Sequence, residues 1–102
     1  MYFDIFKNIE DVHEQWIGSQ DVKDEEVLFA VYSYEDYSGS AFLIYKRDNV
    51  LFEVHDAHCS CFGLENWVPE ETSWAALAMR SYEEYGKEAN DYFQALVKKH
   101  AN

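Results

Sequence analysis

The sequence is short of the residues that cross-link or stiffen small secreted proteins. It has two cysteines, one proline and four glycines in 102 residues. Two thiols separated by one residue do not make the disulfide framework of a small secreted domain, so both are expected to be reduced. The chain also lacks the run of about 20 apolar residues needed to cross a membrane. Its acidic start, "MYFDIFKNIEDVHEQW", does not fit a secretory signal. These absences predict a cytoplasmic protein without a membrane segment.

Positive charge is also scarce. Eight Lys and Arg stand against twenty Asp and Glu, which gives a net charge of −12. Such a chain repels nucleic acid phosphates over most of its surface, so we expect no direct binding to nucleic acid and favour a cationic partner. The alternative is that the acidity serves solubility alone. We expect no cofactor.

The apolar content excludes a disordered chain. Hydrophobic residues make up 48% of the sequence and aromatic residues 18%, which is too much for an unfolded segment. The length suits one domain, residues 1–102, with one core. No Pro-rich linker or repeat indicates a second domain.

Residues 4–17 predict an N-terminal helix. Its apolar side chains recur at spacings that place them on one helical face. Asp4 or Asn8 can cap the first turn, and Gly18 can adopt the left-handed conformation that ends a helix. The residues of the predicted apolar face are Ile5, Ile9, Val12, Trp16 and Ile17.

Three segments that follow predict strands. Residues 27–34, 41–46 and 50–55 are rich in β-branched and aromatic residues, and short turn-forming segments separate them. Short connections favour an antiparallel meander, because parallel neighbours need a long crossover. Both faces of the first two strands carry apolar groups. We therefore expect the second face to be covered by a helix, a partner or a second copy of the chain, and a homodimer is possible.

From Pro69 onward the pattern becomes helical. Proline suits the first helical position and the acids after it suit the positive end of the dipole. Gly86 is expected to interrupt this C-terminal helical segment, which should pack on one face of the sheet. The predicted fold class is therefore α+β. The predicted core residues are Trp16, Phe29, Val31, Phe42, Ile44, Phe52, Val54, Trp74, Leu77 and Leu96.

Four potential metal ligands lie within seven residues, directly after the third predicted strand: His55, His58, Cys59 and Cys61. Zinc accepts these ligand types, but structural zinc sites usually take pairs of ligands from two separate segments. A thiol nucleophile is a second interpretation, although the negative net charge disfavours a thiolate. The third is a tight corner with one or both thiols buried, a turn at Gly63, and Phe62 and Trp67 packed beneath it. We prefer the corner and assign no metal site.

The same region carries a resemblance. The runs "HCSCFGLE" at 58–65 and "WVPEET" at 67–72 follow a Tyr-rich and acid-rich strand end and a hairpin. This pattern, over residues 32–80, resembles a group of small phage and prophage proteins. The resemblance implies viral origin and a host-cell location, and it implies no enzymatic activity.

Acids are concentrated early in the chain. Residues 10–36 contain nine acids and one Lys or Arg. Carboxylates can occupy the positions that DNA phosphates take in a basic groove. Small acidic phage proteins often act as DNA mimics that block restriction enzymes, CRISPR effectors or repair nucleases. By this analogy we expect a protein that binds and inhibits a basic, nucleic-acid-handling host protein.

The predicted partner-binding residues combine acids with tyrosines, which are frequent anchors of interfaces. The alternatives are a solvated face whose tyrosines belong to the core, a metal-binding module that uses residues 55–61, or a structural interaction protein. The predicted partner-binding residues are Asp24, Glu25, Glu26, Tyr34, Glu35, Asp36 and Tyr37.

Overall fold

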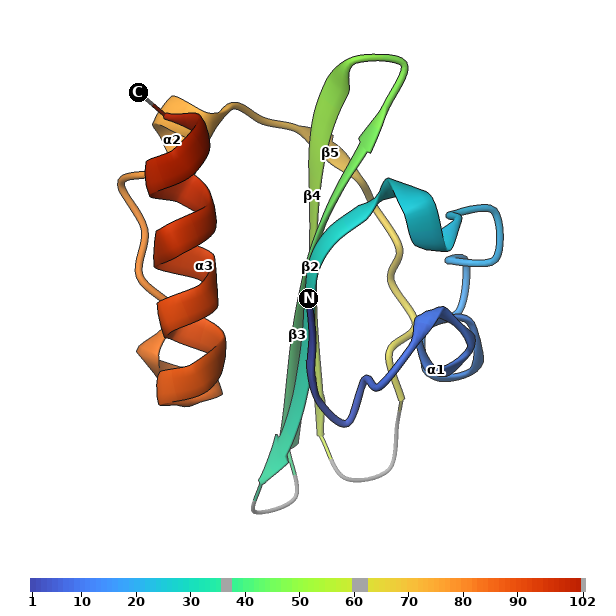
Figure 1. Cartoon of the computed structure of the whole chain (residues 1–102). Helices are drawn as coiled ribbons and strands as arrows, with labels where there is room; N and C mark the ends of the chain where they lie inside the picture. Colours follow the sequence, from blue (N-terminus) through green and yellow to red (C-terminus); the bar gives the residue numbers. More distant parts are fainter. Residues whose placement is uncertain (36–37, 60–62, 102) are drawn as a thin grey trace.

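The computed structural model describes residues 1–35, 38–59 and 63–101 and consists of a mixed sheet with helices on both faces (Figure 1). The sheet has five strands in the order β1-β2-β3-β4-β5, with β1 parallel to β2 and the other neighbours antiparallel. The strands are β1 (Tyr2–Asp4), β2 (Val27–Glu35), β3 (Ser38–Arg47), β4 (Val50–Cys59) and β5 (Glu70–Glu71). The helices are α1 (Ile9–Gln15), α2 (Trp74–Leu77) and α3 (Lys87–His100), with 3-10 turns η1 (Asp24–Glu26) and η2 (Glu83–Tyr85).

The α+β class is confirmed, but the prediction of a three-stranded sheet was wrong. β2, β3 and β4 form the expected antiparallel meander, and each edge gains one short strand. β1 has three residues and β5 consists of two glutamates. Segments this short show no detectable alternation of apolar and polar residues, and glutamate has a low β-propensity. Their pairing is set by the neighbouring backbone rather than by a local pattern.

The N-terminal helix is shorter than predicted. α1 begins after Asn8, whose side chain accepts a hydrogen bond from the backbone N–H of Asp11. Asp11 in turn accepts one from the backbone N–H of Lys7. This reciprocal cap fixes the start of the helix at the second of the two predicted sites. The preceding residues, from 4 onward, belong to β1 and a turn, and Ile17 is 63% exposed beyond the end of the helix.

The C-terminal helical segment is broken near Gly86, as predicted, but its first half is mostly not helical. α2 forms a single turn capped by Ser73, and the chain stays irregular until η2. Side chains of α3 hold this irregular linker. The Asn90 side chain accepts a hydrogen bond from the backbone N–H of Tyr82, and Gln94 donates one to the carbonyl of Arg80. Docking on α3 therefore replaces the internal hydrogen bonds of a helix.

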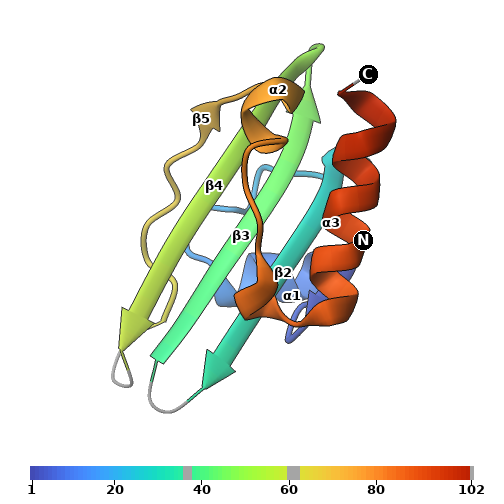
Figure 2. The ribbon, with the colours of Figure 1, turned by 90° about the vertical axis from the view of Figure 1, so that its left-hand side faces the viewer.

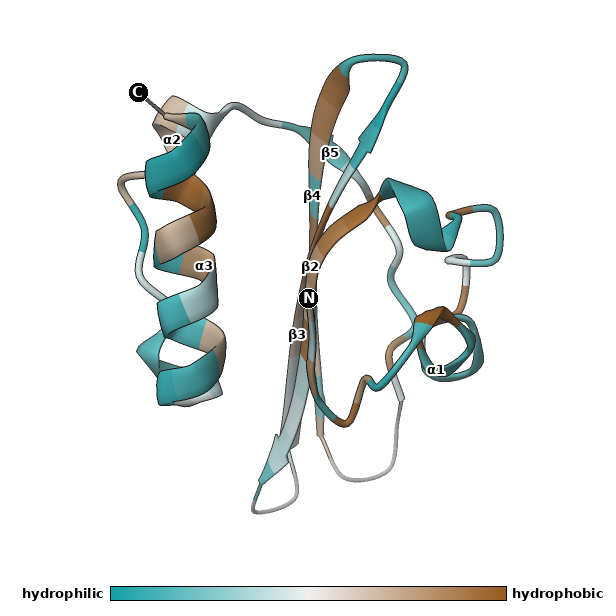
Figure 3. Cartoon of the chain, in the orientation of Figure 1, coloured by the Kyte–Doolittle hydropathy of each residue, from teal (hydrophilic) through white to brown (hydrophobic). Residues whose placement is uncertain are grey.

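Hydrophobic side chains pack on both faces of the sheet, as the apolar strand faces predict. α3 and α2 cover one face, here called the α3 face, and α1 with its following loop covers the other, the α1 face (Figures 1 and 2). The middle of the sheet is hydrophobic, while the turn between β3 and β4 and the turn η1 are hydrophilic (Figure 3). Large buried side chains of the α1 face include Phe6, Trp16, Leu43 and Leu64, and those of the α3 face include Phe29, Phe42, Leu77 and Phe93.

Most of the predicted core is confirmed. Phe52, Trp74 and Leu96 are the exceptions, because each is partly buried at the border of a cluster. Trp74 opens α2 and stacks on His100 with ring centroids 4.5 Å apart, near the end of α3. The buried predicted residues are Trp16, Phe29, Val31, Phe42, Ile44, Val54 and Leu77.

In the described ranges, the helices are too short or too polar to span a bilayer.

Candidate functional site

The predicted partner-binding residues lie at opposite ends of β2 and do not form one patch. Asp24, Glu25 and Glu26 make up η1, directly before the strand, whereas Tyr34 and Glu35 end it. The nine residues of β2 separate these ends by roughly 27 Å, given the rise per residue of an extended strand. The other two predicted residues, Asp36 and Tyr37, lie outside the described residues.

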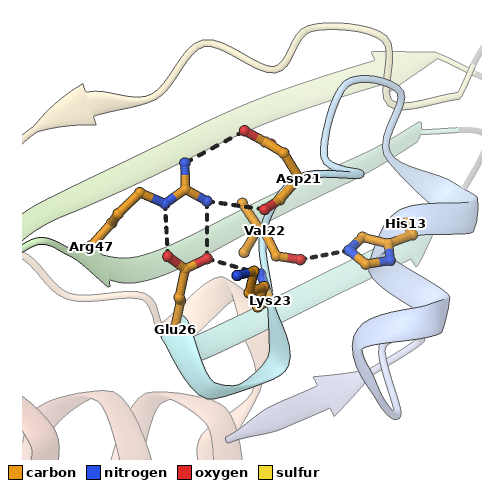
Figure 4. A network of polar contacts seen from close by, with 6 residues as sticks. All are labelled: His13, Asp21, Val22, Lys23, Glu26 and Arg47. Carbon is orange, nitrogen blue, oxygen red and sulfur yellow. Dashed lines mark hydrogen bonds and ion pairs between the residues drawn. The ribbon is translucent and has the colours of Figure 1, made fainter.

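At the first end, Glu26 is held by Arg47 of β3. The Glu26 carboxylate accepts hydrogen bonds from Nε of Arg47 at 2.7 Å and from Nη2 at 2.9 Å. Arg47 also donates to the backbone carbonyl of Asp21 at 3.1 Å (Figure 4). The hydrogen bonds from Arg47 lower the pKa of Glu26 to about 2. Glu26 therefore fastens η1 to β3.

Asp24 has a structural contact as well. It accepts a hydrogen bond from the hydroxyl of Tyr2 at 2.7 Å, which ties η1 to β1. Burial, together with the Asp24 carboxylate, raises the pKa of Tyr2 above its ordinary value. Glu25 is exposed between these two contacts. Of the three predicted acids at this end, Asp24 and Glu25 are exposed and Glu26 is half-buried.

At the second end, the alternation of β2 separates the predicted anchor from the predicted acid. Tyr34 is 45% exposed and its ring lies 5.3 Å from that of His58, on the α1 face. Glu35 points to the α3 face. There it lines a hollow of about 680 Å³. The two side chains therefore cannot meet one flat partner surface together.

Small side chains form the floor of this hollow. Farther along the same face, Phe29, Phe42 and Ile44 are covered by α3. Toward the strand ends, which extend past η2 and α3 in Figure 2, the floor residues become serine, alanine and cysteine. Glu35 of β2 and Glu84 of η2 supply two carboxylates to its lining. We call this feature the serine-lined hollow; its lining includes Ser33, Glu35, Ser38, Ser40, Ala57, Cys59 and Glu84.

The His and Cys cluster does not gather around one point. β4 continues to Cys59, so His55 and His58 lie within the strand and, three residues apart, point to opposite faces. His55 stacks on Phe42 at 4.5 Å on the α3 face. His58 contacts the hydroxyl of Tyr32 at 2.5 Å on the α1 face. One metal ion cannot bind both imidazoles, and the described residues contain no group of three ligands placed for a metal.

The third predicted strand ends four residues later than expected, at Cys59, so the first two residues of the predicted corner at 58–63 belong to β4. Cys59 is exposed rather than buried. Trp67 does pack inward, edge-on to Trp16 with centroids 5.0 Å apart and stacked near Tyr45. Cys61 and Phe62 lie outside the described residues.

Sequence reasoning missed a buried acid on the α3 face. Glu53 is 5% exposed, and its carboxylate accepts hydrogen bonds from Arg80 and from Nε2 of His55, the latter at 2.6 Å. Burial alone would raise the pKa of Glu53, but hydrogen bonds from Thr72, Arg80 and His55 together hold it below its ordinary value. The ion pair fastens the linker between α2 and η2 to β4. An acid at an inward position of the strand "VLFEVH" was the available signal.

The chain matches no protein-family model, and comparisons with curated proteins and with solved structures likewise gave no significant match. The resemblance to phage and prophage proteins stays a prediction. The site must therefore be judged on its chemistry, which is an exposed acidic surface and a polar hollow.

Proposed function

We propose that this protein acts by binding, as a small acidic phage-type protein that inhibits a basic, nucleic-acid-handling protein of the host cell. The supporting observation is the excess of exposed carboxylates. Arg47, Arg80 and Lys87 already pair with acids of the same chain, so they do not neutralise the remaining surface. With a net charge of −12, that surface attracts a basic partner over distances up to about a Debye length.

The spacing of the acids supports a partner whose binding groove normally contacts the DNA backbone. The η1 end and the Glu35 end of β2 are roughly 27 Å apart. One turn of DNA is about 34 Å long, and proteins that grip the backbone make contacts over distances of this order. Carboxylates at both ends can thus engage separate parts of one extended basic groove.

The contacts of the titratable groups support a non-catalytic role. Glu26 is bonded to Arg47 and Glu53 to Arg80 and His55, in arrangements that join one element to another. Both carboxylates are occupied by these contacts. A general base needs a free lone pair within reach of a substrate proton.

The experiment compares two double charge reversals of equal size. Glu25→Lys with Glu35→Lys changes both ends of β2, and Glu70→Lys with Glu71→Lys changes β5, where both residues are also exposed. Each tagged variant is used at low salt to capture proteins from a bacterial lysate, and each captured protein is tested for DNA binding by mobility shift. We expect the unaltered chain to release DNA from its partner, the β5 variant to do the same, and the β2 variant to fail.

Three results would contradict the proposal. One is that no captured protein loses its DNA as the unaltered chain is added. A second is that the β2 variant inhibits as well as the unaltered chain, which would show that these acids serve solubility alone. A partner that stays bound as salt rises to about 0.5 M would also count against an electrostatic mode of binding.

A further inference from the structure

The serine-lined hollow is a gap in an otherwise apolar face. Along β2 the residues of the α3 face run from Phe29 through Val31 to Ser33, and along β3 from Ile44 through Phe42 to Ser40. The large members pack under α3, whereas the small ones leave about 680 Å³ open beside η2. Small-molecule sites have volumes in this range.

The polar groups of the hollow are suited to accept hydrogen bonds. The hydroxyls of Ser33 and Ser38 can donate or accept, and the carboxylates of Glu35 and Glu84 can only accept when ionised. Within the described residues, neither carboxylate belongs to an ion pair, and the lining includes no lysine or arginine. A ligand that complements the negative charge and the acceptors of this lining is therefore a cation with several hydrogen-bond donors.

We propose that the serine-lined hollow binds an arginine side chain of the partner protein, an inference that rests on the proposed function and specifies its contact. A guanidinium carries five N–H donors in a planar fork, and it is more weakly hydrated than an ammonium group. Hydroxyl and carboxylate acceptors that come from β2, β3 and η2 match such a spread of donors better than a point charge. The volume also admits peptide residues that flank the arginine.

A metal ion fits this lining less well. The described residues hold no set of three carboxylate, imidazole or thiol ligands that converge on one point, and the lining residues are among those searched. The side chain of His58 turns to the other face of β4, where Nε2 contacts Tyr32. A larger organic cation can reach both Glu35 and Glu84 without such convergence.

The test is a titration of the isolated, isotope-labelled protein with N-acetyl-arginine amide at low salt, followed by NMR. N-acetyl-citrulline amide, which has nearly the same shape without the charge, is the control ligand. We expect saturable shifts at the amides of Ser33, Ser40 and Glu84 with the arginine probe and weak or absent shifts with citrulline. Shifts that rise linearly on every acidic segment, or equally with both probes, would overturn the proposal.

Two variants separate the hollow from the overall charge. Ser33→Leu fills the floor without a change in charge and should abolish saturable binding, and the amide spectrum away from the hollow reports that the fold is kept. Glu84→Gln should weaken binding about tenfold, because it removes a charged acceptor. Its neighbour Glu83→Gln changes the same charge at a residue outside the lining and should leave affinity unchanged. Equal effects of the two glutamine variants, or full binding by Ser33→Leu, would refute the hollow as the site.

This test is independent of the partner experiment. Saturable arginine binding together with the absence of a DNA-binding partner would keep the hollow and reject the proposed function. A DNA-binding partner without saturable arginine binding would support the proposed function and show that the partner is contacted outside the hollow.

Discussion

At the scale of single residues, Glu53 and Glu26 show how a strongly acidic chain uses some of its carboxylates for structure. Each accepts hydrogen bonds from an arginine that lies on a distant segment of the chain. Hydrogen bonds to charged groups contribute about 1.5–3 kcal/mol each, more than a neutral pair. The Glu53–Arg80 pair therefore helps to fix the linker before η2 to the sheet, and the Glu26–Arg47 pair does the same for η1.

These two acids predict a specific loss of stability in acid. Both have a pKa below the ordinary value of 4.5. Their contribution is thus complete above about pH 4.5 and is lost as the pH falls through the folded-state pKa, about 2 for Glu26. Urea unfolding at a series of pH values should show this loss. Glu53→Gln and Glu26→Gln should each be less stable near neutral pH, by about 2 kcal/mol for Glu53, and should lose less on acidification.

Glu70→Gln is the control for that series, because the residue is exposed on the two-residue strand β5. It should keep the acid sensitivity of the unaltered chain. If all three variants follow the unaltered curve, the two ion pairs do not contribute in solution.

Gly39 offers a second prediction at this scale. A Cβ at this position would lie 2.5 Å from Nε2 of His58 and 3.0 Å from the ring of Tyr32. Gly39→Ala should therefore push the imidazole off the Tyr32 hydroxyl and cost about 1–2 kcal/mol. Thermal unfolding and the ring resonances of His58 measure the two effects. Among the described residues, no atom lies within 4 Å of a Cβ placed at Gly63, so Gly63→Ala should leave both unchanged.

At the scale of elements, α2 depends on packing more than on its own helical propensity. Four residues form one turn, which is too short to be stable alone. Leu77 is fully buried beneath it, whereas Trp74 lies at its border and stacks on His100. The burial of Leu77 holds α2 against the sheet.

Because Leu77 is more deeply buried than Trp74, its truncation should cost more stability, which is the reverse of the order expected from side-chain size. Leu77→Ala should cost about 2–5 kcal/mol, and Trp74→Ala should cost less than the about 3–5 kcal/mol typical of a fully buried aromatic residue. Chemical denaturation of the two variants gives the comparison. A larger loss for Trp74→Ala would show that its contact with α3, rather than Leu77, anchors this part of the fold.

At the scale of the whole molecule, the net charge of −12 acts against the compact state. Like charges over the surface repel one another, and salt screens this repulsion. The melting temperature at neutral pH should therefore rise between about 0.02 M and about 0.3 M NaCl, the same range in which binding to a cationic partner weakens. Calorimetry measures the first trend. A melting temperature that falls with salt would show that ion pairs such as Glu26–Arg47 outweigh the repulsion.

The sequence by itself determined the elements that carry their own pattern. β2, β3 and β4 are long, rich in β-branched and aromatic residues and joined by short turns, so local periodicity was sufficient for the meander. The cap at Asn8 and the break near Gly86 were readable for the same reason, since both depend on the chemistry of one residue. The apolar faces of the strands also predicted that both sides of the sheet are covered.

Tertiary structure alone decided what depends on distant neighbours. β1 and β5 form because β2 and β4 present backbone groups to them, and the linker after α2 is held by Asn90 and Gln94 rather than by helical hydrogen bonds. Acids that are close in the sequence are separated by the length of β2 and by its alternation, because a strand is extended and successive side chains point to opposite faces. The serine-lined hollow has no sequence signature, since it arises where small residues of three strands coincide beside η2.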